Sequence, residues 1–209
     1  KTRYSAVEQK HWNKFGYRHG LMSHKMKKIQ CQNIVILLMI LFKVSLWNSR
    51  ASTPEFINLN VDDGLSQSIV YSVLKDHQGF LWIGTNYGVN KYDGYDFEIF
   101  INNPHDATSL SNNSVRDIME DSRNKLWIGT FGGGVNLYNH EENNFISYKH
   151  NDTIHGSLSD DHVNVLFEDT DKSIWVGTRN GLNKFVGESN RFIHYFHDPF
   201  DALTLSNND

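Results

Sequence analysis

The stretch Asp121-Ser-Arg-Asn-Lys-Leu-Trp127-Ile-Gly-Thr130 decides the fold, because related copies of it occur before and after it in the chain. The earlier copy runs from Asp76 to Thr85 as Asp-His-Gln-Gly-Phe-Leu-Trp-Ile-Gly-Thr. The later copy runs from Asp169 to Thr178 as Asp-Thr-Asp-Lys-Ser-Ile-Trp-Val-Gly-Thr. The tryptophans of the three copies are 45 and 48 residues apart. A period of this length indicates a repeat protein in which each unit is one small structural module.

Other positions keep the same period. A Leu-Ser pair precedes each copy, another follows the third, and a phenylalanine closes each unit. We therefore expect repeats at about 65–109, 110–157 and 158–204, with the start of a further repeat at 205–209. The matched residues are Leu65, Leu110, Leu158 and Leu205, then Val70, Val115 and Val163, and finally Phe97, Phe145 and Phe192.

Each unit contains four short stretches that alternate apolar and polar residues or are rich in β-branched and aromatic residues. In the first unit they are residues 69–75, 80–85, 89–92 and 97–101, and glycine-containing turn sequences separate them. No segment has helical periodicity over ten or more residues. Four strands in a unit of this length are typical of a β-propeller blade. The sequence predicts an all-β fold of about three blades, an incomplete ring that would be an arc of a larger protein, since closed propellers have four to eight blades.

Two local features add to this prediction. Residues 56–61 alternate apolar Ile57, Leu59 and Val61, as a lone outer strand would, and such a strand could complete the last blade of a closed ring. In the turn after each repeated aspartate, the third repeat has Lys172 where the others have glycine or asparagine. Lysine adopts a left-handed conformation less readily, so this turn is expected to be of another type.

Composition places the chain among globular proteins. Of its 209 residues, 39% are hydrophobic and 21% are charged. The length is sufficient for one domain or part of two. Its single cysteine, Cys31, excludes an intrachain disulfide and a Cys-rich zinc module. Residues 1–51 carry ten Lys/Arg and one acid, whereas residues 52–209 carry ten Lys/Arg and 23 acids. Because the repeated part is acidic, we expect it to bind no nucleic acid.

The basic N-terminal part indicates export. Residues 26–52 combine an early Lys27-Lys28 pair, an apolar run from Ile34 to Phe42 and small residues at 51–52, as a signal peptide does. A retained N-terminal anchor is the alternative, although the apolar run is shorter than the ~20 residues that span a bilayer. Since the chain begins with Lys1, residues 1–25 are interpreted as non-native upstream sequence.

The repeats resemble the two-component regulator propeller family. The resemblance covers residues 56–209 and rests on Leu-Trp-Ile-Gly-Thr at 81–85, Gly-Val-Asn-Lys-Tyr-Asp-Gly at 88–94 and Asp-Gly-Leu-Ser at 63–66. It also rests on the Ser-Leu-Ser sequences between the units. In that family two seven-bladed propellers and an immunoglobulin-like domain form a periplasmic sensor. A transmembrane helix and a histidine kinase follow, often with a receiver and a helix-turn-helix domain.

The resemblance implies the N-terminal part of the sensory propeller of a hybrid sensor histidine kinase. Such a protein would lie on the periplasmic side of the inner membrane, anchored in it, and would detect an oligosaccharide. Its partners would be the remaining blades and the membrane and kinase domains of the full-length chain, and family analogy suggests a homodimer. The alternative is an exported propeller, alone or differently fused, that binds a ligand or protein without kinase output.

The repeated residues themselves favour structural roles. Trp82, Trp127 and Trp175 are flanked by aliphatic residues, so we expect them to pack between blades rather than to stack on sugars. The repeated aspartates should accept backbone N–H groups across a turn, with a calcium or catalytic role as the alternative. No set of residues has the spacing of a catalytic or metal site. We therefore expect no cofactor, no metal and no catalytic residue in this segment, although the full-length protein would be an enzyme, a histidine kinase.

We predict that a ligand binds at loops whose residues differ among the repeats while the flanking residues repeat. Directly after each Gly-Thr pair come Asn86-Tyr87, Phe131-Gly132 and Arg179-Asn180. We take Tyr87, Phe131 and Arg179 as the candidate ligand-binding residues, because aromatic and guanidinium groups beside amides suit a polar ligand such as a glycan. Tolerated loop variation without function is the alternative.

Overall fold

Each repeat folds into one four-stranded antiparallel sheet, in agreement with the predicted blade. The computed structural model describes residues 56–209, and the predicted segments 1–25 and 26–52 lie outside these residues. The strands of each sheet follow one another in chain order. The first sheet contains β1 (Val70–Lys75), β2 (Leu81–Thr85), β3 (Gly88–Tyr92) and β4 (Phe97–Phe100). The second contains β5 (Val115–Glu120), β6 (Leu126–Thr130), β7 (Gly134–Asn139) and β8 (Asn144–Tyr148), and the third β9 (Val163–Glu168), β10 (Ile174–Thr178), β11 (Gly181–Val186) and β12 (Arg191–Tyr195).

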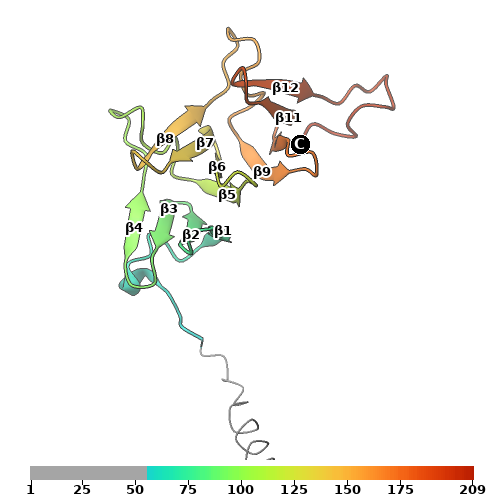
Figure 1. Cartoon of the computed structure of the whole chain (residues 1–209). Helices are drawn as coiled ribbons and strands as arrows, with labels where there is room; N and C mark the ends of the chain where they lie inside the picture. Colours follow the sequence, from blue (N-terminus) through green and yellow to red (C-terminus); the bar gives the residue numbers. More distant parts are fainter. Residues whose placement is uncertain (1–55) are drawn as a thin grey trace, which may run out of the picture. The chain divides into compact units, whose positions relative to one another are not determined.

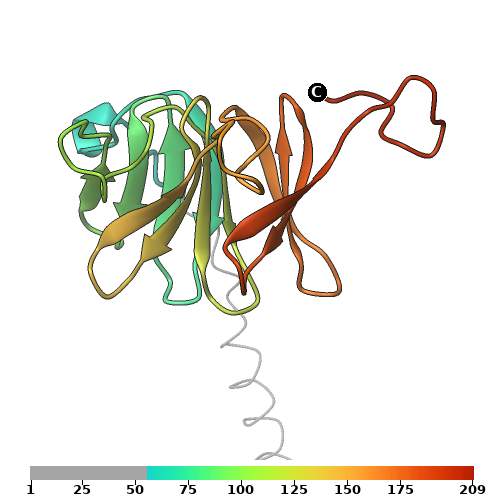
Figure 2. The same ribbon diagram turned by 90° about the horizontal axis from the view of Figure 1, so that it is seen from above.

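The three sheets are arranged as neighbouring blades of a propeller arc (Figure 1). The first strands β1, β5 and β9 lie on the inner side and contact one another, while β4, β8 and β12 lie outside. The β2–β3 turns and the connections between sheets lie at one edge, which we call the crossover face. The β1–β2 and β3–β4 turns, with their counterparts, lie at the opposite edge (Figure 2). Within residues 56–209, no helix has the length and apolar character that crossing a membrane requires.

The glycines of the first two Gly-Thr pairs let the neighbouring sheet approach closely. A Cβ added to Gly84 would lie 2.6 Å from Cγ1 of Val115, and one added to Gly129 would lie 2.6 Å from Cγ1 of Val163. Each valine belongs to the first strand of the next blade. The repeated valine therefore fits against the repeated glycine, and this contact sets the distance between sheets.

The first two tryptophans and all three aspartates have the structural roles that the sequence predicts, while Trp175 is only partly buried. The indole N–H of Trp82 donates to Asp76 Oδ2 at 2.8 Å, while the N–H groups of residues 78 and 80 donate to the other carboxylate oxygen. Trp127 with Asp121 and Trp175 with Asp169 repeat the arrangement. Trp82 is fully buried and Trp127 is 2% exposed, so neither ring can serve as a platform for a sugar.

A buried polar network fixes the crossover face of each blade. In the second sheet Asn136, which is fully buried, accepts the N–H of Ser111 and donates to its hydroxyl oxygen. The Thr130 hydroxyl donates to the carbonyl of Gly134 across the β6–β7 turn, at 2.9 Å. The first and third sheets contain the same network. The loops that start at these residues are thus held by a rigid frame.

The prediction for the Lys172 turn was wrong. Lys172 has φ 65°, close to the 61° of Asn124, and its N–H donates to the Asp169 carbonyl as that of Asn124 does to Asp121. All three turns are therefore of one kind. The aspartate, which bonds two turn N–H groups and the tryptophan, holds the lysine backbone in the left-handed region.

The predicted strand at residues 56–61 is also absent from the structure. Residues 56–60 have no regular structure, and Val61–Asp63 form a 3-10 turn. Asn60 caps this turn by accepting the N–H of Asp62 at 2.7 Å, and Asp63 accepts the N–H of Asn60. These local hydrogen bonds stabilise a turn in place of the alternating strand.

Candidate functional site

A β-bulge recurs at the same place in the inner strand of every sheet. Val70 pairs with Thr85 and Ser72 with Gly84, so Tyr71 is an extra residue between them. The corresponding extra residues are Arg116 in β5 and Asn164 in β9. A bulge leaves one residue out of the ladder and redirects its side chain, and bulges are frequent beside binding sites.

The bulged residues meet the residues that follow the Gly-Thr pairs. The guanidinium carbon Cζ of Arg116 lies 4.3 Å from the centroid of the Tyr71 ring and 4.7 Å from that of Phe131. Cζ of Arg179 lies 4.4 Å from the Phe131 centroid. Tyr71, Arg116, Phe131 and Arg179 thus form a continuous row of alternating rings and guanidinium groups across three sheets. We call it the arginine–aromatic row.

The backbone around the row is fixed by hydrogen bonds. The N–H of Phe131 donates to the Ser114 carbonyl at 2.8 Å, and the N–H of Arg179 donates to the His162 carbonyl at 3.0 Å. The His162 ring packs edge-on against Phe131, with 4.6 Å between centroids. Since these segments belong to the rigid frame of the crossover face, the row is a preorganised surface rather than a set of free side chains.

The row is open to solvent along part of its length. Tyr71 is 41% exposed and Arg179 is exposed, while Arg116 and Phe131 are partly buried. The Tyr71 hydroxyl accepts a hydrogen bond of 3.0 Å from the Asn86 side-chain amide. Rings, guanidinium groups and an amide therefore line one surface, which can stack on a ligand and donate hydrogen bonds to it.

Two of the three predicted binding residues, Phe131 and Arg179, come together in the row. Tyr87 is 55% exposed and is not part of it. By strand register Tyr87 corresponds to Gly132 and Asn180, so Asn86 is the true counterpart of Phe131. A binding role for Tyr87, Phe131 and Arg179 stays a prediction.

Sequence reasoning missed Tyr71 and Arg116. The available signal was that the residue after each repeated valine varies, as Tyr71, Arg116 and Asn164, while its neighbours repeat. Asn164 does not join the row and donates instead to Asp209 Oδ1 at 3.3 Å.

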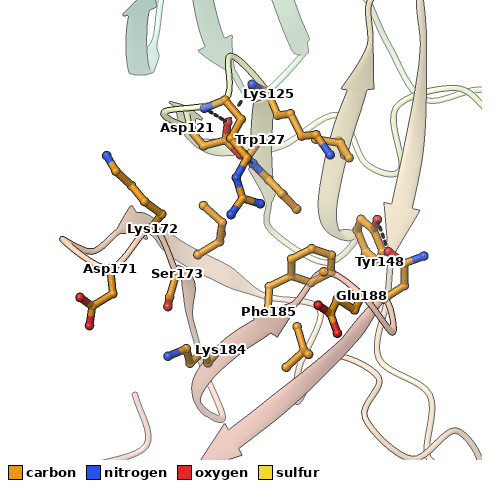
Figure 3. A pocket seen from close by; sticks show the side chains of 16 residues that line it. Asp121, Lys125, Trp127, Tyr148, Asp171, Lys172, Ser173, Lys184, Phe185 and Glu188 are labelled. Atoms are coloured by element: carbon orange, nitrogen blue, oxygen red, sulfur yellow. Dashed lines mark hydrogen bonds between the residues drawn. The ribbon is translucent and has the colours of Figure 1, made fainter.

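A second concave region lies between the outer parts of the second and third sheets, with a volume of about 670 Å³ (Figure 3). Its aromatic floor is already packed, since the Phe185 centroid lies 5.1 Å from that of Trp127 and 5.3 Å from that of Tyr148. Burial raises the pKa of the Tyr148 hydroxyl. Positively charged lysines and negatively charged carboxylates surround this floor. The region is a gap between diverging sheets, and its mixed charges do not favour a ligand of either charge.

Ionisable groups in the described part of the chain offer little for catalysis. Residues 56–209 contain no group of three His, Cys, Asp or Glu side chains placed to hold a metal ion. The pKa of the Asp169 carboxyl is lowered, chiefly by the hydrogen bond from Trp175, which is a structural contact.

The fold and this surface define a β-propeller arc with an aromatic and cationic surface built from repeated bulges and turns. Three segments, residues 64–87, 109–132 and 157–180, match the sequence profile described as two component regulator propeller. Each of the three sheets therefore contains one segment that matches this profile. Each matched segment includes a bulged inner-strand residue and the residue after a Gly-Thr pair, so the profile covers the whole row.

Two known proteins are similar to this chain. Histidine kinase P4 of Formosa agariphila is 42% identical over 82 residues, which are 38% of this chain and 6% of that protein. The extracellular domain of a hybrid two component system of B. thetaiotaomicron aligns with a TM-score of 0.63 and 29% identity, over 67% of this chain and 20% of that one. The chain thus spans a small part of each.

Proposed function

We propose that residues 56–209 form part of the ligand-binding propeller of an exported two-component sensor. We further propose that an oligosaccharide binds on the crossover face at the arginine–aromatic row. The observation that carries this proposal is the row itself, in which recurring bulges turn inner-strand side chains towards Phe131 and Arg179. The similarity to an extracellular domain of a hybrid two component system supports export and sensing.

The surface has the chemistry that sugars need. The exposed ring of Tyr71 can stack on the apolar face of a pyranose ring, Phe131 holds the two guanidinium groups in place, and these groups and Asn86 can donate to hydroxyl groups. A ligand that contacts three sheets at once would favour the arrangement of the blades that brings all of its contacts together. Differential affinity for two such arrangements is what a sensor requires to signal.

The test uses the intact natural protein that carries this segment. We would measure its ATP-dependent autophosphorylation, and saccharide binding by calorimetry, with laminarin, xylan and polygalacturonate fragments as probes. Phe131→Ala should weaken binding of the active probe at least tenfold. Tyr95→Ala, an exposed aromatic residue in the β3–β4 turn of the opposite face, should leave it unchanged.

The outcomes separate the two parts of the proposal. Equal losses for both variants, or none for either, would place the ligand elsewhere. Saccharide binding without any phosphate transfer would overturn the kinase assignment and favour an exported binding propeller.

A further inference from the structure

The two arginines of the row have no acidic partner within residues 56–209. Of the four ion pairs in this part of the chain, three involve histidines and one joins Lys91 to Glu98, and none includes an arginine. Among residues 56–209 the guanidinium groups of Arg116 and Arg179 contact aromatic rings and form no hydrogen bond. Stacking uses the face of a guanidinium group and leaves its in-plane N–H donors available.

Both guanidinium groups converge on one ring. Their Cζ atoms lie 4.7 and 4.4 Å from the centroid of Phe131, so they can be no further apart than the sum of these distances. Two like charges this close repel each other. An anion between or above them would relieve this repulsion.

The nearby carboxylates are engaged by other donors. Asp117, next to Arg116 in the chain, accepts the N–H of Ile118 at 2.9 Å through Oδ1 and the N–H of Leu166 at 2.8 Å through Oδ2. Asp160 bonds the N–H and the ring of His162. In a segment whose acids outnumber its Lys/Arg by more than two to one, two arginines meet at one ring without a carboxylate between them.

We propose that the ligand of the arginine–aromatic row is an anionic saccharide whose carboxylate or sulfate groups bind the N–H donors of Arg116 and Arg179. The inference rests on the proposed function of the same surface and specifies its ligand. Guanidinium groups bind carboxylate and sulfate oxygens in a bidentate manner, and stacking on Phe131 and Tyr71 orients the forks for this contact. The exposed ring of Tyr71 then faces the apolar part of the same sugar.

The experiment measures binding to the intact protein by calorimetry in 50 mM and 300 mM NaCl. The probes are trigalacturonate, which carries carboxylates, a sulfated carrageenan tetrasaccharide, and neutral laminaritriose. The variants are Arg116→Gln, Arg179→Gln, Arg116→Lys and Phe131→Ala. Arg123→Gln, in the β5–β6 turn on the opposite face, is the matched control for the arginine variants. Circular dichroism and the melting temperature establish that each variant is folded.

We expect at least one anionic probe to bind and to bind more weakly at high salt. Each Arg→Gln change should weaken that binding about tenfold to a hundredfold, as loss of a charge-assisted hydrogen bond does. Arg116→Lys should recover only part of the affinity, because lysine lacks the planar fork, and Arg123→Gln should bind as the unchanged protein does. Preference for one anionic probe distinguishes a carboxylate ligand from a sulfate ligand.

Two results would overturn the inference in distinguishable ways. If laminaritriose binds and Phe131→Ala abolishes this binding while the arginine variants do not affect it, the proposed function stands and the ligand is neutral. If no saccharide of either class binds in a Phe131-dependent way, the proposed function fails and the inference fails with it.

Discussion

The guanidinium carbon of Arg179 lies 4.4 Å from the centroid of the Phe131 ring, although the two residues are 48 positions apart. They occupy the same place in neighbouring repeats, directly after a Gly-Thr pair. One turn position thus holds a ring in one sheet and a cation in the next, and the packing of the sheets brings them together.

This pair should contribute little to stability. At an exposed site a cation–π contact stabilises by about 0.5–1 kcal/mol, so Arg179→Ala should lower the local opening free energy by no more than about 1 kcal/mol. Amide hydrogen exchange of peptides from β6 and β10 in the intact protein measures this. A double-mutant cycle with Phe131→Leu should give a coupling of similar size. A coupling of zero would mean that the ring and the cation do not interact in solution.

Gly129→Ala should be much more damaging. Its new Cβ would lie 2.6 Å from Cγ1 of Val163 on the next sheet, so the sheets must move apart. Overpacking of this kind costs about 1–3 kcal/mol, seen as faster exchange in both β6 and β9. Gly187→Ala is the control, because its Cβ would meet only Phe185, at an ordinary 3.6 Å. Equal effects for the two changes would argue against close packing between the sheets.

The strands could be predicted from the sequence because their signals are local. In the first repeat the predicted ranges and the strands β1 to β4 differ by no more than one residue at any end. Alternation and glycine turns within a few residues of each other determine where these strands begin and end. The strand predicted at residues 56–61 is absent, and a local signal opposes it too, because Asn60 caps the 3-10 turn at residues 61–63.

The site was only partly predictable, because it depends on pairing between strands and packing between sheets. Tyr71 and Arg116 reach the row through bulges, and nothing in the local sequence shows that a residue will leave the ladder. Tyr87 was selected for its aromatic ring, although Asn86, directly after the Gly-Thr pair, is the positional counterpart of Phe131.

Asp121→Ala should destabilise the second sheet. The change leaves the indole N–H of Trp127 without its acceptor, and it removes the acceptor of the N–H groups of Arg123 and Lys125. Each unsatisfied buried donor costs about 1–3 kcal/mol, and the indole is the one fully enclosed. We expect the opening free energy of this sheet to fall by about 2–4 kcal/mol. Amide hydrogen exchange of β5 and β6 measures this loss. Asp121→Asn keeps an acceptor oxygen and should lose less, whereas an equal loss would indicate that charge, not acceptance, matters.

The loop at residues 150–158 should be more stable at mildly acidic pH. His150 donates through Nδ1 to the Leu158 carbonyl at 2.7 Å, and this bond is the main cause of a raised pKa, with Asp152 adding to it. A raised folded-state pKa gives stability that is complete below the unfolded value of about 6.5 and is lost as pH rises through the folded value. Exchange of this loop, corrected for intrinsic rates, should be slower at pH 6 than at pH 8. In His150→Gln this difference should disappear, and its persistence would point to another group.

Lys172→Asn should stabilise the third sheet. Lys172 has φ 65°, a left-handed conformation that costs an ordinary side chain about 1–2 kcal/mol and costs asparagine less. Asn124 occupies the equivalent place in the second repeat at φ 61°. We expect a gain of up to about 1 kcal/mol, measured as slower exchange at the β9–β10 turn. Lys125→Asn, next to the equivalent turn residue, changes the same side chain without a positive φ and should give no gain. If both changes stabilise equally, removal of a lysine and not relief of backbone strain is the cause.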